Sequence, residues 1–403
     1  SEEFYRIGRL PPYVFAEVNK LKASARAAGR DIIDFGMGNP DSAPPKHVID
    51  KMIETLKDPK CSRYSLSRGI QGLRKAQAGY YKRRFNVDVD PETEVVVTIG
   101  SKEGLANLAQ AITGPGDRFI VPDPSYPIHV WGFVIAGAEV VPVPNTTGPE
   151  FFTSLKKVLD GPGKKPTALI VNYPCNPTAE VADLAFYEQV VDICKHYGIY
   201  VISDLAYCEI YFDGNPPPSI LQVNGAKDIA VEFTTVSKTY SMAGCRIGFC
   251  VGNKKLVSAL TKIKSYLDYG TFLPLQVAST SAINGPQDYV EKIRETYKNR
   301  RDVLCDGLID AGWNVEVPKA SMFVWAEIPD AYKHLGCLEF SKLLLTRAEV
   351  AVAPGVGFGP GGEGYVRIAL VENRQRIRQA VRNIKQFLAE DPGHNMKAVG
   401  GII

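Results

Sequence analysis

The chain lacks the features that mark several classes of protein. Its eight cysteines include no Cys-x-x-Cys pair and its five histidines show no zinc-ligand spacing, so we expect no metal site. The net charge is only +3 and no basic run occurs, which argues against nucleic acid as a partner. No stretch is apolar enough for a membrane span, and the N-terminus shows no apolar signal-peptide core. These absences predict a cytoplasmic protein with free thiols and no membrane contact.

The bulk composition is that of a large globular protein. With 403 residues, 45% of them hydrophobic and 23% charged, the chain exceeds what one minimal core needs. Short apolar segments alternate with helical ones over about residues 95–251, which indicates an α/β domain. The later segments predict helices at 288–311 and 374–388 and strands at 315–317, 322–328, 350–352 and 365–370. We therefore predict an N-terminal arm and lid at 1–45, a large domain at 46–285 and a smaller α+β domain at 286–403.

Each strand predicted in the large domain ends in polar or aromatic residues. These are Gly100-Ser101-Lys102 after 95–99, Tyr126 after 118–121, Asn176 after 168–171, Asp204 after 199–203, and Ser237-Lys238 after 229–236. Ligands of doubly wound sheets bind at the carboxyl ends of the strands. The clusters are therefore expected to converge on one site.

Lys238 is the most informative of these residues. Desolvation at a strand end, where the chain is expected to enter a loop, lowers the pKa of a lysine, and the unprotonated amine can form an imine with an aldehyde. Ser237 and Arg246 add a hydroxyl and a guanidinium, which suit a phosphate, as do the backbone N–H groups of the helix after Gly100. An imine-forming lysine with phosphate ligands indicates pyridoxal phosphate. The structural alternative is a surface lysine that follows a strand.

Two other charged residues allow both a functional and a structural interpretation. Asp204 follows a buried strand and needs a cationic partner, which a protonated pyridine nitrogen would provide. Alternatively, Asp204 caps a helix that begins at Leu205. Arg367 lies in the apolar strand at 365–370, where its planar fork matches a carboxylate or forms a structural salt bridge.

The uncharged candidates are equally open from the sequence alone. Ser101 either binds phosphate or simply caps its helix. Asn176 and Tyr207 are possible donors to a phenolic oxygen, or parts of turns. Tyr126 can lie flat on an aromatic cofactor or pack in the core. The run 357–362 matches G-x-G-x-x-G, but a strand follows where a dinucleotide site needs a helix, so we interpret it as a flexible loop.

Taken together, these motifs resemble the fold-type I pyridoxal-phosphate enzymes, specifically the class I/II aminotransferases. The motifs that carry the resemblance are Gly100-Ser101-Lys102, Asn176-Pro177-Thr178, Asp204 with Tyr207, and Ser237-Lys238 with Arg246. The stretches 9–15 and 264–271 are most similar to those of bacterial glutamate–pyruvate (alanine) aminotransferases, with aspartate and LL-diaminopimelate aminotransferases as near relatives. The resemblance implies the aspartate aminotransferase-like fold, with a large α/β domain, a mostly parallel sheet and a smaller α+β domain.

The resemblance also implies a role for each candidate residue on the cofactor, pyridoxal 5'-phosphate. Lys238 would form the imine and then act as the base of a 1,3-proton shift. Asp204 would pair with the pyridinium nitrogen, Asn176 and Tyr207 with the phenolic oxygen, and Tyr126 would stack on the ring. The phosphate would be held by Ser101, Lys102 through its backbone, Ser237, Arg246, and Tyr64 of a neighbouring subunit. A homodimer with shared active sites follows from the last of these.

For the substrate, the resemblance implies that Arg367 binds the α-carboxylate with help from the Gly38 backbone and Asn176, and that Tyr13 closes over it. The predicted reaction is L-alanine + 2-oxoglutarate = pyruvate + L-glutamate, by a ping-pong mechanism through pyridoxamine phosphate. Transfer from aspartate, LL-diaminopimelate, methionine or an aromatic amino acid is the alternative. A lyase on the same scaffold and a transcription regulator with an aminotransferase-like domain are further alternatives.

Two departures from the family pattern bear on this prediction. Ala179 stands where the family has glycine after Asn-Pro-Thr, which is expected to alter the turn but not the contact of Asn176. No second arginine for a side-chain carboxylate can be placed. Recognition of glutamate is therefore left without an assigned residue.

Overall fold

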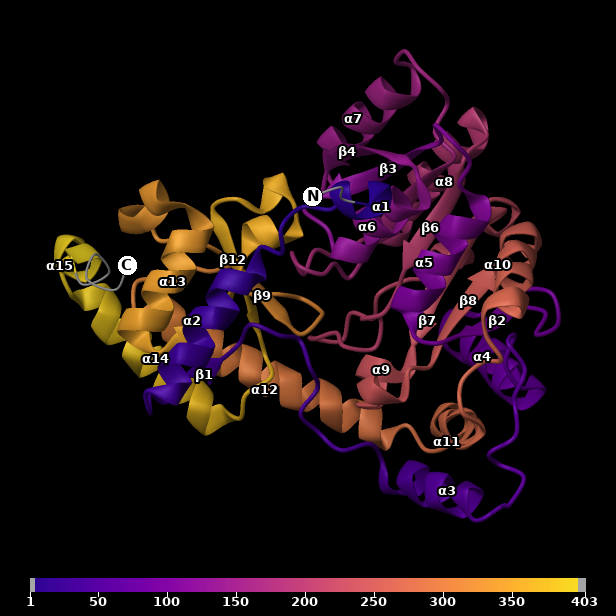
Figure 1. Ribbon diagram of the computed structural model, residues 1–403, viewed down its shortest axis with the longest axis horizontal. Helices are drawn as coiled ribbons and strands as arrows, with labels where there is room; N and C mark the ends of the chain where they lie inside the picture. Colours follow the sequence, from indigo (N-terminus) through magenta and orange to yellow (C-terminus); the bar gives the residue numbers. More distant parts are fainter. Residues whose placement is uncertain (1–3, 398–403) are drawn as a thin grey trace.

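The computed structural model describes residues 4–397, which form a large and a small lobe (Figure 1). The helices are α1 (Tyr5–Gly8), α2 (Phe15–Ala27), α3 (Lys46–Leu56), α4 (Gln71–Phe85), α5 (Ser101–Ile112), α6 (Pro127–Ala136), α7 (Pro149–Leu159), α8 (Leu184–Tyr197), α9 (Val236–Thr239), α10 (Lys254–Leu267), α11 (Leu273–Asn284), α12 (Asp288–Asp310), α13 (Gly336–Ala348), α14 (Arg374–Ala389) and α15 (Pro392–Lys397). None of these helices is long and apolar enough to cross a lipid bilayer.

The large lobe is built on a seven-stranded sheet. Its strands are β2 (Val95–Thr98), β3 (Arg118–Asp123), β4 (Glu139–Pro144), β5 (Ala168–Asn172), β6 (Tyr200–Asp204), β7 (Ala230–Thr235) and β8 (Gly248–Gly252). They lie in the order β2-β8-β7-β6-β5-β3-β4, and all neighbours are parallel except those of β8. The five strands predicted from the apolar runs are confirmed, as is the mostly parallel sheet.

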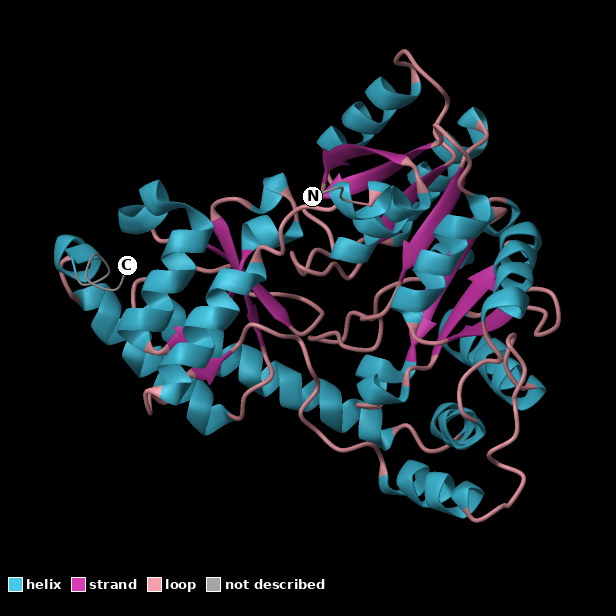
Figure 2. Ribbon diagram, viewed as in Figure 1, coloured by secondary structure: helices cyan, strands magenta, loops and turns pink. Residues whose placement is uncertain are grey.

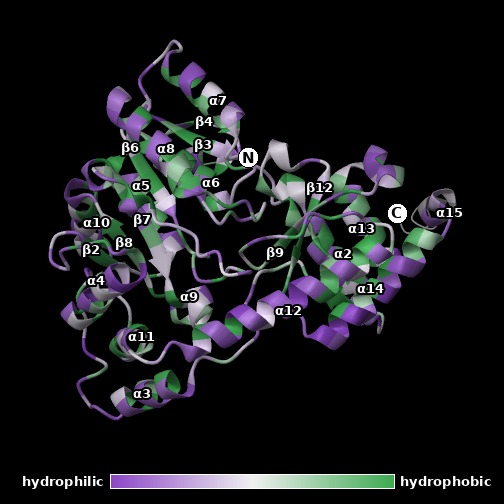
Figure 3. Ribbon diagram, turned by 180° about the vertical axis from the view of Figure 1, so that it is seen from behind, coloured by the Kyte–Doolittle hydropathy of each residue, from purple (hydrophilic) through white to green (hydrophobic). Residues whose placement is uncertain are grey.

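Burial on both faces explains why these runs are almost entirely apolar. Every residue of β2, β5 and β8 is buried, as expected for a sheet covered by helices on both sides. Helices α5, α6 and α10 contribute to the core on one face, and α4, α7 and α8 contribute to the core on the other (Figure 2). Figure 3 shows these strands largely in green, whereas the exposed side of α12 is purple. The sheet is therefore a rigid support for whatever lies at its edge.

The small lobe has its own core around an antiparallel sheet. Strands β9 (Phe323–Glu327), β12 (Tyr365–Ala369) and β11 (Ala353–Pro354) form this sheet in the order β11-β12-β9, while β1 (Ile33–Asp34) pairs with β10 (Val350–Ala351). The strand predicted at 315–317 is wrong. That segment has no strand partner, and it ends at Pro318, whose carbonyl accepts a hydrogen bond from Arg301 on α12.

The chain passes between the lobes at its N-terminal end. The short helix α1 lies on the large lobe, where the Arg9 guanidinium donates to the carbonyls of Val134 and Ala138 at the end of α6. Helix α2 instead packs on α13 of the small lobe. The residues between α1 and α2 therefore connect the large lobe to the small lobe (Figure 1). The domain boundaries at 45/46 and 285/286 stay a prediction.

Candidate active site

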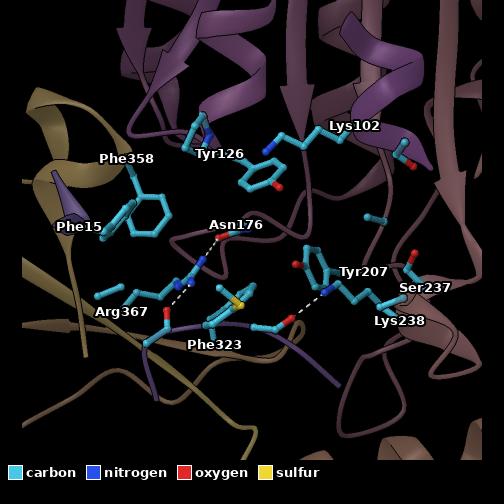
Figure 4. A pocket seen from close by; sticks show the side chains of 18 of the residues that line it. Phe15, Lys102, Tyr126, Asn176, Tyr207, Ser237, Lys238, Phe323, Phe358 and Arg367 are labelled. Carbon is cyan, nitrogen blue, oxygen red and sulfur yellow. Dashed lines mark hydrogen bonds between the residues drawn. The ribbon is translucent and has the colours of Figure 1, made fainter. Parts of the chain in front are cut away.

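The carboxyl ends of the parallel strands open on a cavity of about 480 Å³ between the two lobes (Figure 4). Of the thirteen residues named as candidates, twelve line this cavity. They are Tyr13, Gly38, Ser101, Lys102, Tyr126, Asn176, Asp204, Tyr207, Ser237, Lys238, Arg246 and Arg367. The exception is Tyr64, whose side chain lies outside the cavity, 86% exposed, against the ring of Tyr269. The convergence expected from the strand ends is therefore confirmed.

Lys238 lies in the one-turn helix α9, not in the loop expected after β7. The Thr235 hydroxyl caps this helix by accepting from the Ser237 N–H at 3.0 Å. The partly buried Lys238 Nζ donates to the Gly38 carbonyl at 2.7 Å. Burial, followed by the positive charges of Arg367 and Arg246, lowers the pKa of Lys238 to about 8. A substantial fraction of this amine is therefore neutral near physiological pH.

Asp204 is buried at the end of β6, and its carboxylate faces a histidine that the sequence did not single out. Its Oδ2 lies 2.8 Å from Nε2 of His129, which is 1% exposed on α6. Oδ1 accepts from the Ala206 N–H at 3.2 Å, but a turn follows there and no helix begins, so the cap interpretation is wrong. Within residues 4–397, Asp204 has no lysine or arginine partner. His129 thus holds one oxygen of this buried carboxylate, and Asp204 also lines the cavity.

A second corner of the cavity is rich in unpaired hydrogen-bond donors. Helix α5 begins at Ser101 and has Gly100 at its N-cap, so no side chain caps it, and the Ser101 hydroxyl donates to the Thr234 carbonyl at 3.0 Å. The N-cap interpretation of Ser101 is therefore wrong. A Cβ atom on Gly100 would overlap the guanidinium of Arg246, so this cation lies directly against the start of the helix. Arg246 has no carboxylate partner in the described part of the chain, and the corner suits an anion.

Arg367 projects from the middle of β12 and is 7% exposed. It donates to Oδ1 of Asn176 at 2.7 Å and to the Gly36 carbonyl at 3.0 Å, and its Nε has no hydrogen-bond partner. No carboxylate lies within salt-bridge distance among residues 4–397, so the structural salt bridge considered from the sequence is wrong. Burial lowers the pKa of Arg367 to about 10. A buried cation without an anion is costly, which makes this site receptive to one.

Aromatic rings enclose this arginine. The Phe323 and Phe358 rings have centroids 4.2 Å and 4.6 Å from the guanidinium carbon of Arg367, and Phe15 of α2 packs edge-on against Phe358 (Figure 4). The sequence did not single out these phenylalanines, because an apolar ring carries no chemical signature before its neighbours are known. Phe358 lies in the run 357–362, which forms two short 3-10 turns, η5 (Gly355–Phe358) and η6 (Pro360–Gly362), and is not a simple loop.

Two tyrosines border the space between these charged groups. The Tyr126 ring lies 5.8 Å from the ammonium of Lys102, and burial raises the pKa of Tyr126. The Tyr207 ring lies 5.9 Å from Nζ of Lys238, and burial raises the pKa of its hydroxyl as well. Both hydroxyls therefore stay protonated at neutral pH and can donate a hydrogen bond.

Asn176 is held in place by the turn that precedes α8. Its N–H donates to Oδ1 of Asn172 at 2.9 Å, and Asn172 in turn donates to the Asp204 carbonyl at 2.9 Å. Ala179, where the family has glycine, has a φ of 61°, in the left-handed region that favours glycine. Asn176 nevertheless accepts from Arg367 at 2.7 Å, and its contact with a cofactor stays a prediction.

Comparison with known proteins agrees with this geometry. The family model for aminotransferase class I and II matches residues 30–384. This chain belongs to the class I and II aminotransferases. The aminotransferase is 57% identical to the Rhizobium meliloti protein AatC over 98% of each chain, and AatC is named as an aminotransferase without a substrate. It is 55% identical to the glutamate-pyruvate aminotransferase AlaC of Escherichia coli, over 97% of this chain and 95% of AlaC.

More distant relatives are named for other substrates. An LL-diaminopimelate aminotransferase of Moorella thermoacetica is 41% identical over 96% of this chain and 99% of its own. Among solved structures, apo-BacF of Bacillus subtilis superposes with a TM-score of 0.88 at 36% identity, covering 94% of this chain and 96% of its own. A Thermus thermophilus aspartate aminotransferase variant gives the same TM-score at 27% identity, over 96% and 99% of the two chains. The aspartate aminotransferase-like fold is therefore confirmed.

Proposed function

We propose that this aminotransferase transfers the amino group of L-alanine to 2-oxoglutarate, reversibly, in two half-reactions. The observation that carries the chemistry is the pairing of a depressed-pKa lysine, Lys238, with an unpaired buried arginine, Arg367, in one cavity. The choice of alanine and glutamate is supported by the similarity to AlaC, whose name states that pair.

The donor set fits pyridoxal 5'-phosphate as the cofactor. The uncapped start of α5 and the unpaired Arg246 match a phosphate, with Ser101 and Ser237 beside them. Asp204, already polarised by His129, would hold a protonated ring nitrogen. Asn176 and Tyr207 would donate to the phenolic oxygen, and Tyr126 would pack on the ring. When bound, the cofactor supplies the electron sink that stabilises negative charge at the substrate Cα.

Arg367 is proposed to bind the α-carboxylate of the amino acid. The fork of a guanidinium matches a carboxylate bidentately, and the phenylalanines around it exclude water and strengthen the ion pair. Asn176 and the Gly36 carbonyl hold the fork before the substrate arrives, so its orientation is set in advance. The Gly38 backbone and Tyr13 would complete this end of the site.

Lys238 is proposed to move the proton of the reaction. Lys238 lines the cavity in which the substrate would bind. Its neutral Nζ can accept a proton from the substrate Cα and release it to a second atom of the bound substrate and cofactor. A pKa of about 8 suits this exchange, since neither the charged nor the neutral amine is strongly favoured near neutral pH. The Gly38 carbonyl holds the amine at 2.7 Å between these steps.

Separate measurement of the half-reactions tests the substrate assignment. With the loaded enzyme in excess, loss of the yellow cofactor band is followed for alanine, glutamate, aspartate and LL-diaminopimelate. We expect alanine and glutamate to react with kcat/KM values at least about 100-fold above the other two, the difference that about 2.7 kcal/mol of selective binding provides. Faster reaction with aspartate or LL-diaminopimelate would transfer the assignment to that relative's substrate. Release of ammonia would indicate a lyase instead.

We also propose that the active unit is a homodimer in which Tyr64 reaches the phosphate of the partner's cofactor. Exposed aromatic side chains on one part of the surface support this, with Tyr64 at 86%, Tyr266 at 83% and Tyr269 at 64% exposed. Sedimentation velocity is expected to give the mass of two chains, and Tyr64→Phe to weaken retention of the cofactor about tenfold. A fully active monomer would contradict the proposal.

The lobes are proposed to be domains that move relative to each other, divided as the sequence predicted at 45/46 and 285/286. A cytoplasmic location is proposed as well. The state of the cysteines supports it, because all eight are free thiols and seven of them are buried.

A further inference from the structure

The glycine-rich run 357–362 connects the small lobe to the large lobe at the edge of the cavity. The Gly361 N–H donates to Oδ2 of Asp123, at the end of β3, with a distance of 2.9 Å. Two residues further along the large lobe, the Ser125 N–H donates to the Phe358 carbonyl at 2.8 Å. The motif rejected as a dinucleotide site therefore has a specific contact of a different kind.

Residues 357–362 approach Asp123 closely because two of them, Gly359 and Gly361, have no side chain. Gly359 has a φ of +120°, and a Cβ atom there would overlap Oδ1 of Asp123. A Cβ atom on Gly361 would lie 2.9 Å from the Asp123 carbonyl oxygen. Both glycines thus let the backbone close on the carboxylate at a distance that other residues would prevent.

Asp123 has no competing cationic partner. Among residues 4–397 its carboxylate forms no salt bridge, and its hydrogen bond is the one from Gly361. Burial raises the pKa of Asp123, as expected for a carboxylate with a backbone donor alone. Among residues 4–397, the glycine run is therefore the partner that holds the Asp123 carboxylate.

The contact with Asp123 also bears on Arg367, because Phe358 belongs to the same run and packs on its guanidinium. Phe358 is the last residue of η5, and its ring lies 4.6 Å from the Arg367 guanidinium and 5.7 Å from the ring of Phe15. One of the two backbone bonds is made by the carbonyl of Phe358 itself, and the other is made three residues later, by Gly361. Fixing the run against Asp123 therefore fixes the ring that covers the arginine.

We propose that Asp123 is a positioning residue for recognition of the α-carboxylate, acting through the glycine run and Phe358 on Arg367. This inference rests on the proposed role of Arg367. The contact is already made in the structure and holds Phe358 against Arg367 before a substrate binds, so part of the substrate's affinity depends on a carboxylate that does not touch it. Loss of the contact raises the free energy of the substrate-bound state with little effect on proton transfer at Lys238.

The test compares Asp123→Ala with Asp123→Asn in the holoenzyme. We expect Asp123→Ala to raise the KM for amino acids, and the dissociation constant of the monocarboxylate propionate, about tenfold, as one lost hydrogen bond would. Its kcat stays within about threefold of the wild type. Asp123→Asn keeps an acceptor oxygen and restores both constants. Asp117→Ala is the matched control, because Asp117 also accepts a backbone N–H, that of Gly114 at 2.6 Å, but precedes β3 at its far end; its constants stay unchanged.

A double-mutant cycle separates positioning from general loosening of the fold. If Asp123 acts through Phe358, adding Asp123→Ala to Phe358→Ala raises KM no further. Additive effects, or an Asp123→Ala enzyme with unchanged propionate binding, overturn the proposal. Should Arg367→Ala leave propionate binding unchanged, the assumed role of Arg367 fails, and that result is distinct from failure of the Asp123 contact.

Discussion

Replacement of Lys238 by alanine is expected to abolish multiple turnovers, lowering kcat by at least about a thousandfold. The substitution removes the amine that is proposed to hold the cofactor and to carry the proton, and general base catalysis alone contributes roughly 10²–10⁴-fold. A steady-state assay with alanine and 2-oxoglutarate measures the loss. Lys238→Arg, which keeps a positive charge but supplies no neutral amine near pH 8, should fare no better. An Ala variant that turns over repeatedly would remove the lysine from its proposed role.

The same residue predicts a pH dependence with a defined sign. Only the neutral amine reacts with an acylating reagent, so labelling of Lys238 in the cofactor-free protein should rise with pH around a midpoint near 8. Peptide mapping identifies the labelled site, and Lys238→Ala gives the background. The pKa of Lys238 is lower in the folded state than in the unfolded state, so the folded state binds fewer protons between about pH 8 and 10.4. The contribution of this group to the free energy of unfolding therefore rises as the pH rises through that window. A labelling midpoint near 10.4 would mean that burial does not perturb the amine.

Replacement of Arg367 by alanine is expected to lower kcat/KM for amino acids about a thousandfold. Two charge-assisted hydrogen bonds would be lost, each worth about 1.5–3 kcal/mol. Arg367→Lys keeps the charge but not the planar fork, and we expect a loss of about 10–100-fold. Initial rates over a range of alanine concentrations give both values.

A substrate without a carboxylate provides the control for Arg367. Ethylamine has the amino group and methyl of alanine but no anion for the guanidinium to bind. Its slow reaction should therefore be changed less than about threefold by Arg367→Ala. Equal losses with alanine and ethylamine would show that the substitution damages the site as a whole, and carboxylate recognition would have to be assigned elsewhere.

The sequence predicted the large sheet and most of the cavity for one physical reason. Strands buried on both faces are apolar throughout, so a polar residue directly after one stands out, and parallel strands bring their carboxyl ends to one edge. Lys238, Asp204 and Asn176 were found in this way. Arg367 was found because an arginine in an apolar strand is anomalous, although the sequence could not decide between a ligand and a salt bridge.

The features that escaped prediction depend on contacts between distant segments. His129 is one histidine in an apolar helix, and its bond to Asp204 exists only because the fold brings α6 to the carboxyl end of β6. Phe358 and Phe323 look like ordinary core residues until they are seen on either side of Arg367. Ser101 is not a cap because the helix begins one residue earlier than expected, with Gly100 at the N-cap, and its hydroxyl donates to the Thr234 carbonyl, 133 residues away. The strand expected at 315–317 failed because alternation of apolar residues supplies no pairing partner.

One short turn from the N-terminal part of the chain holds both reactive cations of the cavity. The carbonyl of Gly36 accepts from Arg367 and that of Gly38 accepts from Lys238. These two oxygens are neutral acceptors, so they hold Arg367 and Lys238 in place but leave the positive charge of the buried Arg367 without an anion. A substrate carboxylate would add the negative charge that a main-chain oxygen lacks. Because both acceptors belong to one peptide segment, a substitution that shifts residues 36–38 is expected to disturb the hydrogen bonds of Arg367 and Lys238 together.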